Sequence, residues 1–382
     1  MRSMVTATGV ETRPASITIA WSDGTAGEFA SVWLRDNLPE DRDGHSGQRL
    51  IDVMDIPAAP RIRSASLKNG TIEVDWADEQ RHSSFDIGWL YECARGNPQR
   101  PELQIRMWLE GAKCNPNRDF GWLTFQALQA EPQARLTWLT RLLQDGIAFL
   151  SDVPRRDNAI LEATAYIGYV PETNYGRVFD VRAVPQPENL AYSDLGLGLH
   201  TDNPYRDPVP GFQALHTLVA APDGGDSLFA DGFAIAEHLR TTERQAFQTM
   251  SHTPVPFWYR AAGVDLYSER PLIELNCLGT VTAVNYNNRA IRPVRLPAAE
   301  CAAYYSSYRR FAALLREPRL QMATRLRDGD LAIFDNRRVL HGRTGFASAR
   351  HPRHLQGCYL TRDSVYSATA VLRRELASGP AA

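Results

Sequence analysis

Apolar and polar positions alternate along the first part of the chain, and this period predicts short strands. Residues 16–21 alternate, and residues 66–74 flank Asn69-Gly70, a pair typical of a two-residue hairpin turn. Residues 36–60 are rich in Asp, Pro and Gly, which favours a loop. These patterns predict a small β-rich domain at the N-terminal end.

The pattern then becomes helical and returns to strands. Leu136, Leu139 and Leu143 share one face of a predicted helix, and Gly146 suits its C-terminal end. A buried strand is expected next, over residues 147–150. Further strands are predicted over residues 212–220, 227–230, 281–286, 331–334 and 354–360, and helices at about 233–250 and 298–316.

Many short strands separated by turns predict a sandwich or jelly roll, with the early helices packed outside it. We therefore expect a mainly β fold with helices. A β-rich domain would occupy residues 1–95, a polar linker with Gly and Pro residues 96–118, and a jelly-roll catalytic domain residues 119–382.

Composition narrows the function classes. The 382 residues are 43% hydrophobic and 23% charged, with a formal net charge of −2, so the basic bias of nucleic-acid-binding proteins is missing. No stretch approaches the roughly 18 apolar residues of a membrane span, and no apolar segment near the start predicts a signal peptide. The five cysteines are scattered and never form a CxxC pair, which argues against a disulfide framework. We expect a cytoplasmic protein without nucleic-acid or membrane partners.

The most informative residues are two histidines and a carboxylate. His200 and Asp202 are two apart in an extended segment and therefore point the same way, while His341 follows a later predicted strand. Two histidines and one carboxylate form the facial triad of iron(II) oxygenases, which leaves positions open for other ligands.

Arg353, twelve residues after His341, can bind the distal carboxylate of 2-oxoglutarate through two parallel hydrogen bonds. Taken alone, the segment His200-Thr201-Asp202 could form a surface turn, and Arg353 could form a surface salt bridge. His216, on a predicted core strand, is interpreted as a structural histidine.

Longer motifs surround these residues: His200-Thr201-Asp202, Gly224-Gly225-Asp226-Ser227, Asn285-Tyr286-Asn287-Asn288, Leu340-His341-Gly342-Arg343 and Arg353-His354-Leu355-Gln356-Gly357. Over nearly the whole chain they resemble the γ-butyrobetaine and trimethyllysine hydroxylases of the wider taurine-dioxygenase-like group. The resemblance implies a double-stranded β-helix in which His200, Asp202 and His341 bind Fe(II). It places Arg353 and Ser227 at 2-oxoglutarate, with O2 as the second cosubstrate. It also implies stimulation by ascorbate and a homodimer.

The resemblance also implies a substrate site. An aromatic cage for a trimethylammonium group matches Tyr175, Phe179, Tyr192 and Tyr359, with Phe179 in place of a Trp. The anionic end of the substrate would lie at Asn189 and Asn287.

Arg289 departs from the carboxylate-binding pattern, because a guanidinium beside the anion site suits a more highly charged anion. A phosphonate fits that description, and the sequence therefore also resembles the bacterial dioxygenase of [2-(trimethylamino)ethyl]phosphonate. This resemblance implies hydroxylation at carbon 1 with release of succinate and CO2, and the sequence favours this substrate. The first alternative is hydroxylation of γ-butyrobetaine to carnitine, with Arg289 pointing to solvent. A taurine-like sulfonate is disfavoured because it needs no aromatic cage. From another class, the second alternative is a non-catalytic binding protein on the same barrel.

A zinc site of the family is altered in the N-terminal domain. The family binds zinc through three cysteines after Trp-Leu-Arg-Asp-Asn and a later histidine. Here these positions hold Leu38, Glu40, Asp43 and His82. Because structural zinc prefers Cys and His ligands, we predict no structural zinc.

Overall fold

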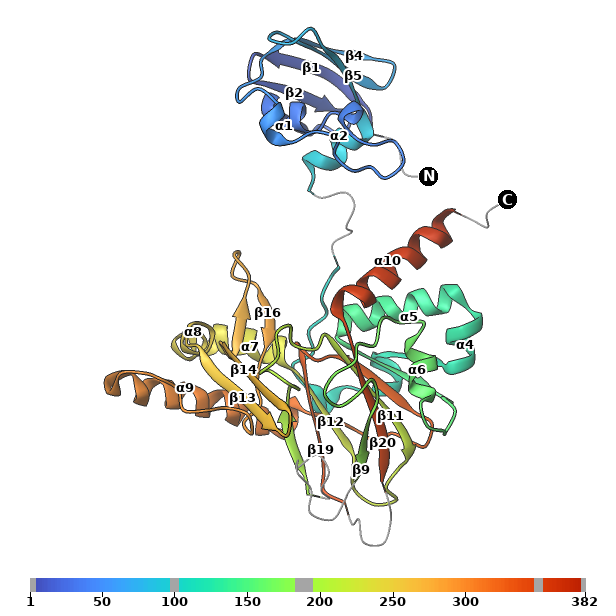
Figure 1. Cartoon of the computed structure of the whole chain (residues 1–382), viewed down its shortest axis with the longest axis vertical. Helices are drawn as coiled ribbons and strands as arrows, with labels where there is room; N and C mark the ends of the chain where they lie inside the picture. Colours follow the sequence, from blue (N-terminus) through green and yellow to red (C-terminus); the bar gives the residue numbers. More distant parts are fainter. Residues whose placement is uncertain (1–4, 97–102, 183–194, 347–352, 379–382) are drawn as a thin grey trace. The chain divides into compact units, whose positions relative to one another are not determined.

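The computed structural model describes residues 5–96, 103–182, 195–346 and 353–378. It divides into two compact units, residues 1–102 and 103–382, which are considered separately (Figure 1). The second unit begins inside the segment expected to be a linker. Its first residues pack against the rest of that unit, since the backbone N–H of Trp108 donates to Asp231 Oδ2 over 3.1 Å.

In its described residues, the N-terminal unit contains two three-stranded antiparallel sheets, two α-helices and two short 3-10 helices. Asn69 and Gly70 both have positive φ, 48° and 85°, as the predicted hairpin turn requires. Ile17, Ile19, Trp76 and Phe85 are almost fully buried and form its core. The elements are β1 (Ala7–Arg13), β2 (Ser16–Trp21), β3 (Ala26–Ala30), α1 (Ser31–Asp36), β4 (Ile62–Lys68), β5 (Thr71–Trp76), β6 (His82–Asp86) and α2 (Ile87–Ala94).

The residues at the altered zinc positions have other contacts. Leu38 is buried in the core, and Glu40 accepts a 2.8 Å hydrogen bond from Ser83 Oγ. Beside them, the buried Arg35 binds Glu79 at 2.6 Å and Asp41 at 2.8 Å. The other two altered positions are also engaged: Asp43 accepts from Ser46, and His82 lies between Glu73 and Asp75. All four positions therefore have contacts within this unit.

The second unit is built on two sheets that face each other. Six strands have the order β7-β8-β18-β11-β20-β9, and four have the order β10-β19-β12-β17. Every pair is antiparallel except β7 with β8. Phe149 and Phe334 from the large sheet pack against Phe229 from the small one, so the core lies between the sheets. This is the expected double-stranded β-helix. Its strands are β7 (Gly121–Thr124), β8 (Ile147–Ser151), β9 (Phe179–Arg182), β10 (Leu197–His200), β11 (Phe212–Val219), β12 (Ser227–Asp231), β17 (Met322–Thr324), β18 (Leu331–Asp335), β19 (Val339–Arg343) and β20 (His354–Leu360).

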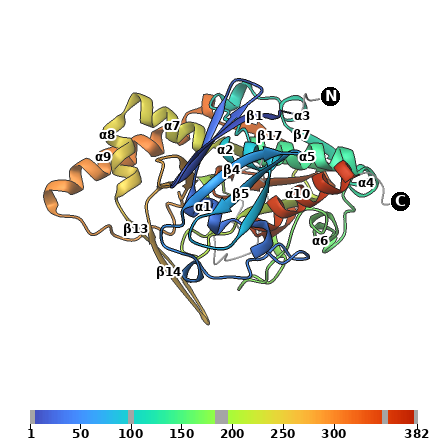
Figure 2. The ribbon, with the colours of Figure 1, turned by 90° about the horizontal axis from the view of Figure 1, so that it is seen from above.

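One group of helices covers the outer face of the large sheet (Figures 1 and 2). The leucines predicted to share a helix face lie on α5, and Gly146 ends this helix in the left-handed conformation, with φ 76°. A C-terminal helix, α10, packs beside α5; the sequence analysis did not predict it. The helices on this side are α3 (Pro116–Asp119), α4 (Phe125–Ala130), α5 (Pro132–Asp145), α6 (Ala159–Thr164) and α10 (Arg362–Ser378).

A second group of elements lies on the opposite side of the barrel (Figure 2). The helix expected at 233–250 is two helices that meet at Glu243, whereas the helix expected at 298–316 has those bounds. A long hairpin, β13–β14, was not predicted. The elements are α7 (Gly232–Thr242), α8 (Arg244–His252), β13 (Val255–Ala261), β14 (Val264–Arg270), β15 (Ile273–Leu275), β16 (Val281–Val284) and α9 (Ala298–Arg316). Among the described residues, no helix is both long and apolar enough to span a membrane.

Candidate active site

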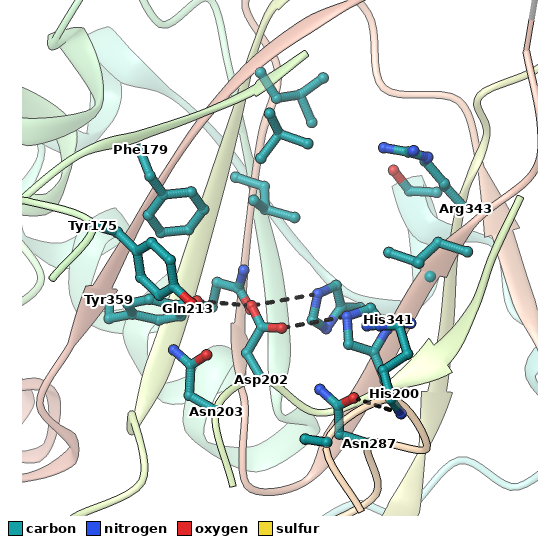
Figure 3. Close-up of a pocket in the computed structure, with 18 of the residues that line it drawn as sticks. Tyr175, Phe179, His200, Asp202, Asn203, Gln213, Asn287, His341, Arg343 and Tyr359 are labelled. Carbon is teal, nitrogen blue, oxygen red and sulfur yellow. Dashed lines mark hydrogen bonds and ion pairs between the residues drawn. The ribbon is translucent and has the colours of Figure 1, made fainter. Parts of the chain in front are cut away.

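The predicted metal ligands come together at the end of β10. His200 is paired directly with His341 on β19, and the ring centroids are 4.3 Å apart. Asp202 follows in the loop after β10, with Oδ1 at 3.3 Å from His200 Nε2 and Oδ2 at 3.9 Å from His341 Nε2. One ligand atom from each residue lies within 4.8 Å of the others, which a single ion could bridge (Figure 3).

Neighbouring groups hold this loop in place. His200 Nδ1 lies 3.0 Å from the carbonyl of Gly198, and donation from that nitrogen leaves Nε2 free as a ligand. The buried Asn336 clamps the backbone of Asp202 from both sides: its Oδ1 accepts from Asp202 N at 2.7 Å, and its Nδ2 donates to Asp202 O at 3.0 Å. Thr201 exchanges backbone and side-chain hydrogen bonds with Tyr286. The ligands are therefore oriented before any metal binds.

The protonation states suit a metal. Burial, reinforced by His200 and Arg289, lowers the pKa of His341 to about 3, so this imidazole is neutral. Burial by itself would raise the pKa of Asp202, but hydrogen bonds and the adjacent histidines hold that pKa below its usual range. Two imidazoles and one carboxylate on one side of an open cavity form a donor set that fits Fe(II).

The triad borders a cavity of about 360 Å³ that contains a cationic end. Arg353 and Ser227 both line it, and both are buried. Burial and the nearby Arg343 lower the pKa of Arg353 to about 10, which still leaves the guanidinium charged at neutral pH. Gly225, with φ 67°, makes room for this arginine, because a Cβ there would lie 3.1 Å from Arg353 Cδ. This end can receive the distal carboxylate of 2-oxoglutarate.

Aromatic rings form another wall of the cavity. The centroids of Phe179 and Tyr359 are 5.1 Å apart, and those of Tyr175 and Phe179 are 6.2 Å apart (Figure 3). The wall continues through Tyr205 and Tyr259, whose rings stack at 5.1 Å. Three of the four predicted cage residues are thus brought together. The fourth, Tyr192, and the predicted anion-site residue Asn189 lie outside the described residues.

Arg289 and Asn287 line the same cavity. Loss of solvent lowers the pKa of the Arg289 guanidinium, which is close enough to the triad to lower the pKa of His341. Within the described ranges its guanidinium has no hydrogen bond or ion pair, so its charge is available to a ligand. Asn287 Nδ2 already donates to the carbonyl of Thr201 at 3.1 Å, which leaves one amide hydrogen for a substrate.

Sequence reasoning missed several residues of the cavity. Tyr205 follows the His-Thr-Asp motif by three residues, a proximity that could have drawn attention to it. Trp258 and Tyr259 lie on the unpredicted hairpin and carried no motif. Gln213 is buried on β11 and lines the cavity, and alternation along that strand could have identified its face.

Comparison with known proteins agrees with this geometry. The model of the taurine catabolism dioxygenase TauD, TfdA family matches residues 116–359, and the gamma-butyrobetaine hydroxylase-like N-terminal model matches residues 10–91. The gamma-butyrobetaine dioxygenase of Pseudomonas sp. (strain AK-1) is 34% identical, covering 94% of each chain. The Homo sapiens gamma-butyrobetaine dioxygenase is 28% identical over 94% of this chain and 95% of its own, and the mitochondrial trimethyllysine dioxygenase of Rattus norvegicus is 26% identical over 91% and 83%.

These matches span both units and include the triad, its loop and the cationic end of the cavity. The chain belongs to the taurine catabolism dioxygenase TauD, TfdA family and is a dioxygenase that depends on Fe(II), 2-oxoglutarate and O2.

Proposed function

We propose that this enzyme hydroxylates γ-butyrobetaine to carnitine, with 2-oxoglutarate converted to succinate and CO2. The observation that carries the proposal is an aromatic wall beside the triad in a chain 34% identical, nearly end to end, to a gamma-butyrobetaine dioxygenase. The relatives favour this substrate over the phosphonate that the sequence alone favoured.

The aromatic wall supports a quaternary ammonium substrate. Tyr175, Phe179 and Tyr359 present their rings to the cavity, and each face attracts such a cation by about 0.5–2 kcal/mol. Trimethylammonium cannot donate a hydrogen bond, so ring faces and shape are its main means of recognition. Asn287 and Arg289, also in the cavity lining, can hold the opposite, anionic end.

Each part of the cavity then has one task. His200, Asp202 and His341 would hold Fe(II), which activates O2 for hydroxylation when 2-oxoglutarate is bound. Arg353 and Ser227 anchor the far carboxylate of that cosubstrate. Binding the substrate at both ends leaves the central methylenes facing the metal, which favours attack at one carbon because the reacting atoms are already positioned.

A second candidate substrate is [2-(trimethylamino)ethyl]phosphonate, and Arg289 is the observation that favours it. A guanidinium without a partner among the described residues suits a phosphonate, which carries more charge than a carboxylate. The same cation could also serve a carboxylate, so the choice between the two substrates requires a direct comparison.

The experiment measures succinate and hydroxylated product from both compounds with the iron-loaded enzyme. Faster turnover of γ-butyrobetaine supports the proposal, and faster turnover of the phosphonate replaces it with the second candidate. Arg289→Ala should weaken turnover of the phosphonate more than that of the carboxylate. Arg295→Ala is the matched control, because Arg295 is exposed and is not part of the cavity lining. If neither compound is hydroxylated, the assignment of a trimethylammonium site is wrong.

We also propose a homodimeric assembly and a cytoplasmic location for this enzyme. They rest on the family resemblance and on the scattered cysteines. Size-exclusion chromatography with light scattering tests the first, and cell fractionation tests the second.

A further inference from the structure

Tyr359 connects the aromatic wall with the metal ligands. Its ring contacts Phe179, while its hydroxyl donates a 2.9 Å hydrogen bond to Asp202 Oδ2 (Figure 3). The side chain comes from β20 and is 5% exposed, so it is held firmly between the two. One residue thus belongs both to the wall that faces the substrate and to the support of the metal-binding carboxylate.

The hydrogen bond distinguishes the two oxygens of Asp202. Oδ1 is the oxygen nearer to a histidine, at 3.3 Å from His200 Nε2, whereas Oδ2 accepts from Tyr359. Asn336 fixes only the backbone of Asp202. Within the described ranges, His200 and Tyr359 are the side chains that hydrogen-bond this carboxylate. The Tyr359 hydroxyl therefore holds the plane of the carboxylate, and Oδ1, which has no such donor from Tyr359, would be left to bind a metal.

The hydroxyl is a persistent donor. A phenol hydroxyl keeps its proton at neutral pH, so beside the carboxylate oxygen of Asp202 it acts as the donor. Hydrogen bonds to ionised acceptors are among the stronger ones in proteins.

We propose that Tyr359 is a positioning residue that links occupancy of the substrate site to the strength of the iron's carboxylate ligand. A trimethylammonium group against the ring draws electron density from the phenol and makes its O–H a stronger donor. The stronger hydrogen bond orients the Asp202 carboxylate more firmly, so the metal site responds to the arrival of substrate. The link rests on the proposed function, because it requires a cation at the ring; the support of Asp202 by the hydroxyl does not.

Tyr359→Phe separates these roles, since it keeps the ring and removes only the hydroxyl. The matched control is Tyr91→Phe in the N-terminal unit, because the Tyr91 hydroxyl also donates to a carboxylate, Asp23 Oδ2 at 2.7 Å, and Tyr91 is not part of the cavity lining. Unfolding temperatures near that of the wild type show that both variants fold.

The first measurement is Co(II) affinity of the metal-free protein without substrate. Loss of a group that orients a metal ligand typically weakens metal binding by about 10- to 100-fold, and Tyr359→Phe should fall in that range while Tyr91→Phe binds as the wild type does. Equal Co(II) affinity in Tyr359→Phe and wild type overturns the proposal.

The second measurement is the visible spectrum of the Co(II) protein with 2-oxoglutarate before and after addition of γ-butyrobetaine. The wild-type and Tyr91→Phe spectra should shift, whereas Tyr359→Phe should bind the compound by calorimetry with little shift. An equal shift in Tyr359→Phe overturns the link. If γ-butyrobetaine does not bind the wild type, the proposed function fails, and the same titration with tetramethylammonium decides the link.

Discussion

Gly357 determines where the Phe179 ring lies, and adding one methyl group there should weaken substrate binding. Gly357 is paired with both Leu215 and Phe179 across neighbouring strands. A Cβ at this position would lie 2.4 Å from Phe179 Cε2 and 2.5 Å from its Cζ, whereas ordinary contacts begin at 3.4 Å. In Gly357→Ala the ring must therefore retreat by about 1 Å. Phe179 lies on β9, at the edge of the large sheet, so the ring can move without breaking the barrel.

The magnitude follows from the loss of one aromatic face. That face contributes about 0.5–2 kcal/mol to binding a quaternary ammonium group. Its loss should therefore raise the dissociation constant by roughly 2- to 30-fold. Calorimetry with γ-butyrobetaine in the anaerobic Fe(II) and 2-oxoglutarate complex measures it. Affinity for 2-oxoglutarate should not change, because Arg353 and Ser227 are not part of this contact.

A double-mutant cycle with Phe179→Leu tests the cause. If Gly357→Ala acts by displacing the ring, the double variant should bind γ-butyrobetaine no more weakly than Phe179→Leu alone. Unchanged affinity in Gly357→Ala, or full additivity in the double variant, would refute the reasoning.

Three further predictions concern other parts of the catalytic unit. Arg353→Lys should raise the KM for 2-oxoglutarate by roughly 10- to 100-fold, since a paired hydrogen bond to a carboxylate is lost; steady-state kinetics measure it. Arg338→Met should lower the free energy of unfolding by about 3–5 kcal/mol in denaturant titrations, because it leaves Asp231, its 2.7 Å partner, buried without its ion-pair partner. Burial lowers the pKa of His216 to about 4 from its ordinary 6.5, so the unfolded chain takes up a proton first as pH falls. Stability should therefore drop between pH 6.5 and pH 4 by up to roughly 3 kcal/mol, and His216→Leu should flatten that part of the profile.

Each of these has a contrary outcome. A proportional rise in the KM for the trimethylammonium substrate in Arg353→Lys would indicate general damage to the cavity. If Arg338→Met unfolds at the wild-type denaturant concentration, the pair with Asp231 contributes little. An acid profile unchanged by His216→Leu would assign the loss of stability to other groups.

Much of the fold and the metal site could be predicted from sequence, because ligand chemistry and the spacing of apolar residues are properties of short segments. Few residue types bind Fe(II), so His200, Asp202 and His341 could be identified before their distances were known. Asn69-Gly70 and Gly146 marked a turn and a helix end, because positive φ is a local requirement that few residues meet. Short β-type runs also predicted the main strands of the barrel.

The tertiary structure decided which residues meet at the cavity, because those contacts join segments that are distant in sequence. The hairpin β13–β14 placed Tyr259 against Tyr205, although the two are far apart in sequence and share no motif. Asn287 was expected to hold the substrate, yet one of its amide hydrogens supports the loop that carries Asp202. The local pattern shows which residues can form a strand or bind a metal. Which faces of those strands meet across a cavity depends on the pairing of the sheets, and that pairing is a property of the whole unit.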